Sequence, residues 1–195
     1  MAYSTATIVS LALQCAPSVA PETVVAIVRT ESRGHVFALN VNGGRQPRRQ
    51  ASAAAAAATA KRYVAAGYSV DLGLGQINSR NMRWLGLTWE TVFDPCTNIA
   101  ALGRVLTQNY NSVKAGRDPQ SALRIALSMY NTGSQSRGFR NGYVAKVVGN
   151  AGIADSQVSY TPTASQPIAE TSGDLRTTIV AENAAQQAPP RPAPP

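Results

Sequence analysis

The sequence predicts a mainly helical, α+β domain that is followed by a disordered tail. Apolar residues recur at helical spacing through most of residues 1–152, and a glycine-rich stretch near residues 67–80 interrupts them. Hydrophobic residues make up 44% of the chain, which is typical of a globular protein. We therefore expect one folded domain over residues 1–152 and a disordered Pro/Ala/Thr/Gln-rich tail over residues 153–195, whose composition cannot form a core.

Three helices are expected in the first half of the domain. Residues 5–15 form the first, because their apolar side chains share one face. The second begins at Pro21, a residue suited to the first helical turn, and is ended by Gly34. The third contains a helix-favouring run of alanines from residue 53 and stops at Gly67.

Two more helices begin at Asp-Pro pairs. The pair at residues 94–95 opens a helix that ends at Gly116, and the pair at residues 118–119 opens the next one. Residues 67–80 combine glycines with β-branched residues, which favours an irregular loop or a short hairpin. The expected fold is therefore helical, with a small β element at most.

The net charge of +8 is unevenly distributed. Residues 1–154 carry 16 Lys and Arg and 6 Asp and Glu, a net charge of +10, whereas residues 155–195 have a net charge of −2. Such a domain should be attracted to polyanions such as nucleic acid, anionic lipid or the carboxylate-bearing peptides of the bacterial cell wall. A generic solvated surface explains the charge equally well.

No apolar run approaches the ~18 residues of a membrane-spanning helix, so no span is expected.

The two cysteines, Cys15 and Cys96, permit a single intramolecular disulfide. They would bond in an exported protein and remain thiols in a cytosolic one. Residues 18–20 have the small side chains of a signal-peptide cleavage site, but the first basic residue is Arg29, so the positively charged start of a secretory signal is missing. The pairing and the export route therefore stay open.

Glu31 is the first candidate for chemistry. It occupies position i+7 of an apolar helix face that begins at Val24, and glycine follows soon after it. A carboxyl group at such a site loses hydration, so its pKa should rise, as a general acid requires near neutral pH. The alternative is a surface ion pair of Glu31 with Arg29 or Arg33.

Two later segments carry groups suited to a ligand. In residues 71–78 the glycines allow a close backbone approach, and the amides of Gln76 and Asn78 suit sugar hydroxyls and acetamides. An ordinary glycine turn is the alternative. Tyr130 and Asn131 stand at the end of a predicted helix, where they would face a cleft, although Tyr130 would equally well fit a core.

Four short motifs in this order resemble those of soluble lytic transglycosylase domains, which are part of the lysozyme-like superfamily. They are Glu31-Ser32, Gly73-Leu74-Gly75-Gln76-Ile77-Asn78, Tyr130-Asn131-Thr132-Gly133 and a late tyrosine, Tyr143. Each motif is weak alone, but the four together are specific. The resemblance covers about residues 10–150 and is closest to the transglycosylases of type IV secretion and conjugation systems, whose long helical insert resembles residues 43–68. The segments around Cys15 and Cys96 also look like that subgroup.

The resemblance implies a lysozyme-like fold and an enzyme that cleaves the MurNAc–GlcNAc β-1,4 bond of peptidoglycan, leaving 1,6-anhydromuramyl ends. It implies that the enzyme opens the wall for a secretion apparatus and acts in the periplasm or cell envelope. It also implies a reaction that needs no cofactor or metal. Glu31 would be the catalytic acid and base. The implied substrate-binding residues are Ser32, Gln76, Asn78, Tyr130, Asn131 and Tyr143. The chain departs from the family at His35-Val36, where relatives often have Asn-Pro, so the cleft edge there is expected to differ.

Asp71 opens a segment that also resembles the part of animal lysozymes that begins with their second catalytic aspartate. A retaining hydrolase needs two carboxyl groups ~5 Å apart, whereas a transglycosylase can rely on the acetamide of its substrate. We favour the one-carboxylate reaction and treat Asp71 as a candidate second carboxylate.

The sequence fits other functions less well. A hydrolytic lysozyme would use Asp71, and a non-catalytic wall-binding scaffold would recruit secretion components through the tail, but it would not need Glu31. Nucleic-acid binding is disfavoured because no recognition motif occurs and aromatic residues are only 6%. The sequence lacks a Cys/His cluster, a Gly-x-Ser-x-Gly elbow and a phosphate loop, which argues against metal, serine-hydrolase and nucleotide chemistry.

Overall fold

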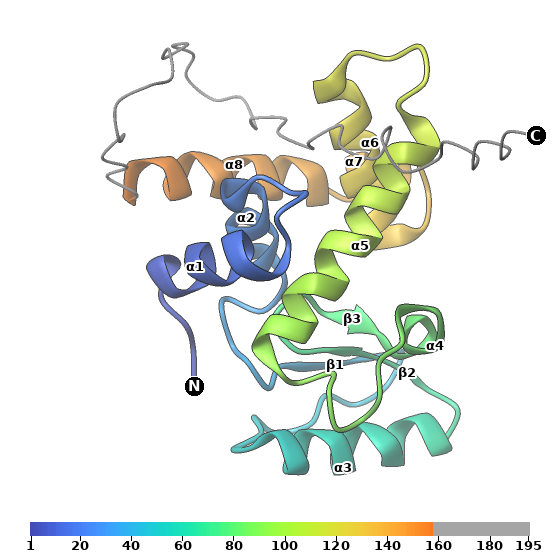
Figure 1. Cartoon of the computed structure of the whole chain (residues 1–195). Coiled ribbons are helices and arrows are strands. Elements are labelled where there is room, and N and C mark those ends of the chain that lie inside the picture. The colour runs from blue at the N-terminus through green and yellow to red at the C-terminus, as the bar shows by residue number, and fades with distance from the viewer. Residues whose placement is uncertain (158–195) are drawn as a thin grey trace, which may run out of the picture.

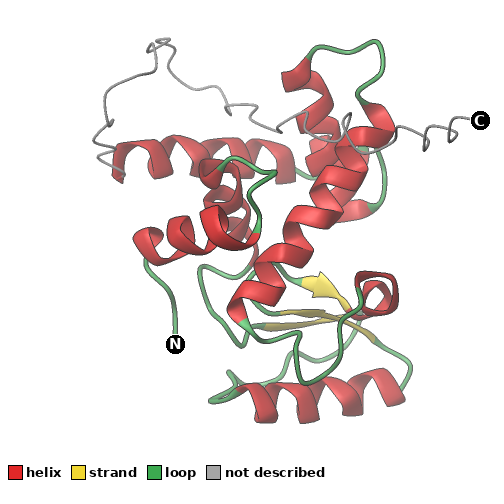
Figure 2. Cartoon of the chain, viewed as in Figure 1, coloured by secondary structure: helices red, strands yellow, loops and turns green. Residues whose placement is uncertain are grey.

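The structure, a computed structural model, describes residues 1–157, with side chains to residue 152. The helices are α1 (Thr5–Cys15), α2 (Pro21–Glu31), α3 (Ala53–Ala65), α4 (Met82–Leu85), α5 (Pro95–Val113), α6 (Pro119–Thr132), α7 (Arg137–Arg140) and α8 (Tyr143–Gln157), with a short 3-10 turn η1 (Ser79–Asn81). The strands are β1 (Leu39–Asn42), β2 (Ser69–Leu72) and β3 (Ile77–Asn78). The predicted mainly helical α+β fold is confirmed (Figure 2).

The buried hydrophobic residues form two clusters. In Figure 1, α1, α2 and α8 cluster together, α5 crosses the molecule diagonally, and α3 runs along the far side of the sheet. The larger core joins α1, α2, α5, α6 and α8, whereas the smaller one packs the sheet against α3. Side chains on α2, on the sheet and on α6 therefore meet where the two regions adjoin.

The sheet is antiparallel, in the order β1-β2-β3. Strands β2 and β3 form the short hairpin that was one of the two expectations for residues 67–80. Strand β1 was not predicted, because four residues carry too little alternation to be distinguished from a loop. Its register places Asn40 opposite Asp71, and on the other side of β2 Asp71 lies opposite Asn78.

The expected helix starts are present and capped as their residue types suggest. The side chains of Ser52, Asp94 and Asp118 each accept a backbone N–H from the first turn of the helix that follows. Proline occupies the first turn of α2, α5 and α6. These local signals explain why the sequence placed these helices correctly.

The sequence analysis did not predict α4, α7 or α8. The first two have four residues each, too few for a periodic pattern. Helix α8, described over Tyr143–Gln157, packs along α2. The predicted disorder of the rest of the tail, residues 158–195, lies outside the described residues.

A disulfide joins Cys15 at the end of α1 to Cys96 in the first turn of α5, with a Cα–Cα distance of 5.4 Å. It closes a loop with a sequence separation of 81 residues that contains α2 and the whole sheet.

Among the helices described, none has the length and apolar character needed to cross a membrane.

Candidate active site

Glu31 is the last residue of α2, and its position at the helix end follows from a sharp turn of the chain. Arg33 has a φ of +55° and Gly34 a φ of +79°. A Cβ at Gly34 would lie 2.8 Å from the backbone oxygen of Tyr3, so glycine is required there. The turn leaves the Glu31 side chain at the edge of a cavity that no further turn of α2 covers.

Burial raises the pKa of Glu31 to about 7. The nearby charge of Asp71 raises the pKa as well, whereas a hydrogen bond from Tyr143 and the charge of Lys146 lower it. A carboxyl group with this pKa keeps its proton in a large fraction of molecules at neutral pH, which suits a general acid.

The alternative surface ion pair of Glu31 is wrong. Arg29 donates instead to the hydroxyl of Thr5, and no ion pair joins Glu31 to Arg29 or Arg33 in the described part of the chain. The apolar face of α2 therefore carries Glu31 toward the interior rather than toward solvent.

Tyr143 holds the carboxyl group of Glu31. Its hydroxyl donates to Glu31 Oε1 at 2.6 Å, and its ring is 8% exposed at the start of α8. Burial and the Glu31 charge keep the pKa of Tyr143 well above its ordinary value of 10, so this hydroxyl remains a donor. Asn141 accepts the backbone N–H of Tyr143 at 3.0 Å and orders the start of α8.

Replacing Tyr143 with phenylalanine should shift the alkaline limb of the pH–rate profile to higher pH. The lost hydrogen bond lowers the pKa of Glu31, so its removal lets that pKa rise and keeps the acid protonated further into the alkaline range. We expect kcat/KM at neutral pH to fall by about tenfold or less, since Tyr143 also orients the carboxyl group. The pH profile of kcat/KM measures this, and a limb that stays or moves to lower pH would contradict it.

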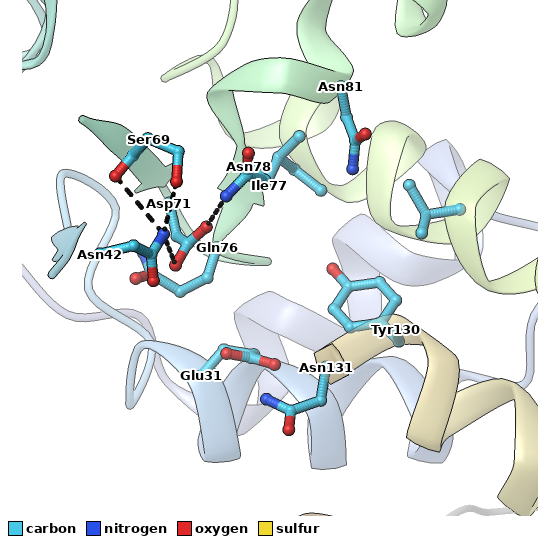
Figure 3. Close-up of a pocket in the computed structure, with 11 residues that line it drawn as sticks. Glu31, Asn42, Ser69, Asp71, Gln76, Ile77, Asn78, Asn81, Tyr130 and Asn131 are labelled. Atoms are coloured by element: carbon cyan, nitrogen blue, oxygen red, sulfur yellow. Dashed lines mark hydrogen bonds between the residues drawn. The ribbon is translucent and has the colours of Figure 1, made fainter. Parts of the chain in front are cut away.

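Asp71 lies across the cavity from Glu31, and Figure 3 shows it between Asn42 and Asn78. With Asn40, three asparagine amides hold its carboxylate. Asn40 and Asn42 on β1 each donate to Oδ2 at 3.0 Å, and Asn78 on β3 donates to Oδ1 at 2.6 Å. Each strand of the sheet thus contributes to one cluster around the charge. Such charge-assisted bonds fix the orientation of the carboxylate.

Asn40 and Asn42 were not predicted from the sequence as site residues. Their spacing of two residues is the signal that would have found them, because alternate residues of a strand share one face. That signal depends on recognising β1, which the sequence did not reveal.

The glycines near Gln76 allow close packing within the protein. A Cβ at Gly73 would lie 2.5 Å from the side chain of Asn98, and one at Gly75 would lie 3.1 Å from Leu102. Gln76 has a φ of +48°, and its amide nitrogen donates to the backbone oxygens of Gly73 at 2.8 Å and Ala38 at 3.3 Å. Gln76 therefore lines the cavity while its nitrogen braces the turn.

Asn98 is a further residue that the sequence analysis missed. It is 1% exposed, accepts the N–H of Gly75 at 2.8 Å, and donates to the backbone oxygens of Leu72 at 3.1 Å and Val92 at 2.8 Å. This side chain of α5 fixes the β2–β3 turn and so the position of the whole motif.

The other predicted site residues differ in accessibility. Tyr130 lines the cavity and donates to the backbone oxygen of Gly75 at 2.6 Å, and Asn131 lines it as an exposed residue of α6. Ser32 borders the adjoining cavity, but it is buried and its hydroxyl is bonded within the turn after α2. The structure thus gathers all of the predicted residues around Glu31, with Ser32 in a turn-forming position.

Two adjoining cavities of about 220 and 410 Å³ form one cleft beside Glu31 and Asp71. Both are also lined by the amide side chains of Asn42, Gln76 and Asn131. Amides of this kind suit hydroxyl and acetamide groups. Within residues 1–152 no group of three or more His, Cys, Asp or Glu side chains could bind a metal ion.

Residues 9–149 match the family model described as "Transglycosylase SLT domain", which is well over half of the chain. The chain belongs to this family. The chain is 38% identical over 159 residues to the type IV secretion system protein virB1 of Brucella suis, with 78% of this chain and 67% of that protein covered. It is 41% identical over 138 residues to protein virB1 of Agrobacterium fabrum, with 71% and 56% covered.

A third relative, protein virB1 of Rhizobium radiobacter, is 39% identical over 137 residues, with 70% of this chain and 57% of that protein covered. The matched part of the chain therefore spans little more than half the length of the Agrobacterium and Rhizobium proteins. No solved structure matches the chain.

Proposed function

We propose that this chain is a lytic transglycosylase that cleaves the MurNAc–GlcNAc β-1,4 bond of peptidoglycan, with Glu31 as both acid and base. The observation that carries the proposal is the partly buried Glu31 carboxyl group at the cleft, whose pKa of about 7 allows it to give and take a proton near neutral pH. Membership of the SLT family supports the same reaction.

In the first step Glu31 gives its proton to the glycosidic oxygen, and the bond from C1 of MurNAc to that oxygen breaks. The GlcNAc leaves with a free 4-hydroxyl, and the acetamide of MurNAc stabilises the positive charge at C1. In the second step the MurNAc 6-hydroxyl attacks C1 and gives its proton to ionised Glu31. The 1,6-anhydro ring closes, Glu31 regains its proton, and no water is consumed.

The cellular setting is proposed from the relatives. The Brucella protein is named as a component of a type IV secretion system, so we propose that this chain opens the wall for such an apparatus. The Cys15–Cys96 disulfide fits an oxidising compartment such as the periplasm. A role of the tail in binding secretion components is part of the proposal and concerns residues outside those described.

Mass spectrometry of the muropeptides that the protein releases from purified sacculi tests this function. A transglycosylase yields 1,6-anhydromuramyl ends and incorporates no oxygen from labelled water. Release of reducing ends would replace the proposed reaction with hydrolysis, and no release at all would leave a wall-binding module.

The second candidate function is a hydrolytic lysozyme, and the observation that favours it is the position of Asp71. The carboxylate faces Glu31 across the cavity and is held by three amides, as a nucleophile or charge-stabilising group would be. We retain the transglycosylase because one carboxylate and the substrate acetamide suffice for its reaction.

Replacing Asp71 with asparagine should lower kcat/KM by about tenfold or less and leave the anhydro products unchanged, because substrate assistance still operates. The new amide nitrogen of the variant is a donor and would face at least one of the asparagine donors, so a hydrogen bond would be lost there. The melting temperature of the variant is therefore compared with that of the parent. A folded but inactive variant, together with reducing ends from the parent, would favour the lysozyme.

A further inference from the structure

A second hollow, which two arginines line, lies beside the cleft at α7. It has a volume of about 550 Å³ and is lined by Thr132, Arg137, Arg140 and Asn141. We call it the α7 hollow. Neither of its cations has an ion-pair partner among the described side chains, and none of its lining residues is acidic.

The α7 hollow adjoins the cleft through a pair of asparagines. Asn141, in the wall of the hollow, donates to Asn131 Oδ1 at 2.9 Å, and Asn131 lines the cavity that holds Glu31. Figure 3 shows Asn131 directly beside Glu31. Asn141 also accepts the N–H of Tyr143, the residue that bonds Glu31. A glycan bound at Glu31 would therefore have the α7 hollow at its side.

The helix that carries the arginines is fixed in place. Gly138 donates its N–H to Ser128 Oγ at 2.9 Å, and a Cβ at Gly138 would lie 2.5 Å from Ser128 Cα, so α7 packs directly on α6. Arg137 Nη2 donates to the backbone oxygen of Thr132 at 2.6 Å, and Arg140 Nη1 donates to Ser136 Oγ at 3.0 Å. These bonds restrain both guanidinium groups and leave most of their N–H donors for a ligand.

We propose that the α7 hollow binds a carboxylate of the peptide stem that MurNAc carries. The inference rests on the proposed function, since it needs a muropeptide strand in the cleft. Guanidinium groups bind carboxylates through paired, charge-assisted hydrogen bonds, and peptide stems carry free carboxylates beside the sugar whose glycosidic oxygen Glu31 protonates. The same arginines would also attract the phosphates of an anionic lipid surface, but the position of the hollow at the cleft favours the stem.

The test uses the Glu31→Gln protein, which should keep the site while cleavage is slowed by about 10²–10⁴-fold. Isothermal titration measures its affinity for three glycan oligomers of equal length: one with peptide stems, one with the stem carboxylates amidated, and one without stems. Arg137→Gln/Arg140→Gln is compared with Arg45→Gln/Arg62→Gln, which removes the same charge from exposed positions outside the cleft and the hollow.

We expect the stem-bearing oligomer to bind about fivefold to tenfold more tightly than the other two, and the advantage to shrink as salt is added. Arg137→Gln/Arg140→Gln should remove this advantage, and Arg45→Gln/Arg62→Gln should keep it. An advantage that is absent, that survives amidation, or that both double variants lose alike would overturn the proposal.

Two further arms separate the alternatives. If Arg137→Gln/Arg140→Gln lowers pelleting with phosphatidylglycerol vesicles but leaves the stem advantage intact, the hollow binds a lipid surface and the proposal is wrong. Cleavage of stem-free strands by the parent protein reports on the proposed function alone, because the α7 hollow has no ligand there. An active parent that shows no stem advantage therefore refutes the inference but not the function.

Discussion

Replacing Glu31 with glutamine should reduce wall lysis by about 10²–10⁴-fold, at the upper end of that range because the same group serves both proton transfers. Glutamine has nearly the same shape and can still accept the hydrogen bond from Tyr143, so the site should keep its geometry. Release of soluble muropeptides from purified sacculi measures the loss. A folded variant with lysis near that of the parent would remove Glu31 from the mechanism.

The free energy of unfolding of the same variant, measured against pH, provides an internal control. Glu31 has a pKa of about 7 in the folded protein against 4.5 for an ordinary glutamate, so the folded state holds its proton more tightly than the unfolded state. The parent should therefore lose stability as the pH rises from about 4.5 to 7, whereas glutamine does not titrate. Above pH 7 we expect the variant to be more stable than the parent by about 3 kcal/mol, and near pH 4 to be equal. A variant that is less stable at pH 8 would contradict the buried, charge-disfavouring environment.

Removing the Cys15–Cys96 disulfide should lower the free energy of unfolding by about 4 kcal/mol. The loop that it closes is long, with a sequence separation of 81 residues, so the bond strongly restricts the unfolded chain. A loss of this size is a large fraction of the stability of a small domain. The bond also ties α1 to α5, the helix whose Asn98 fixes the β2–β3 turn, so activity should fall as the protein unfolds.

Urea unfolding of the Cys15→Ala/Cys96→Ala protein, compared with the parent under oxidising and reducing conditions, measures this loss. The reduced parent and the double variant should unfold at similar urea concentrations, both below that of the oxidised parent. A difference under about 1 kcal/mol would show that the unfolded chain keeps its ends close without the bond.

The helices that open the domain could be predicted from local signals alone. Pro21 in a first turn, the alanine run of α3, and the Asp-Pro starts of α5 and α6 act within one or two helical turns, so neighbouring residues determine them. The placement of Glu31 on an apolar face followed from the same kind of periodicity, and its raised pKa was expected for that reason.

The sequence by itself thus determined the helical class of the fold, the candidate acid and, through its ordered motifs, the family. The tertiary structure alone decided how the candidates act together. The amides of Asn40 and Asn42 reach Asp71 only when β1 pairs with β2, Tyr143 meets Glu31 only when α8 packs along α2, and Asn98 holds the Gly75 turn from a distant helix. The physical reason is that such hydrogen bonds join residues far apart in the chain, and no local propensity or spacing encodes the backbone packing that brings them within reach.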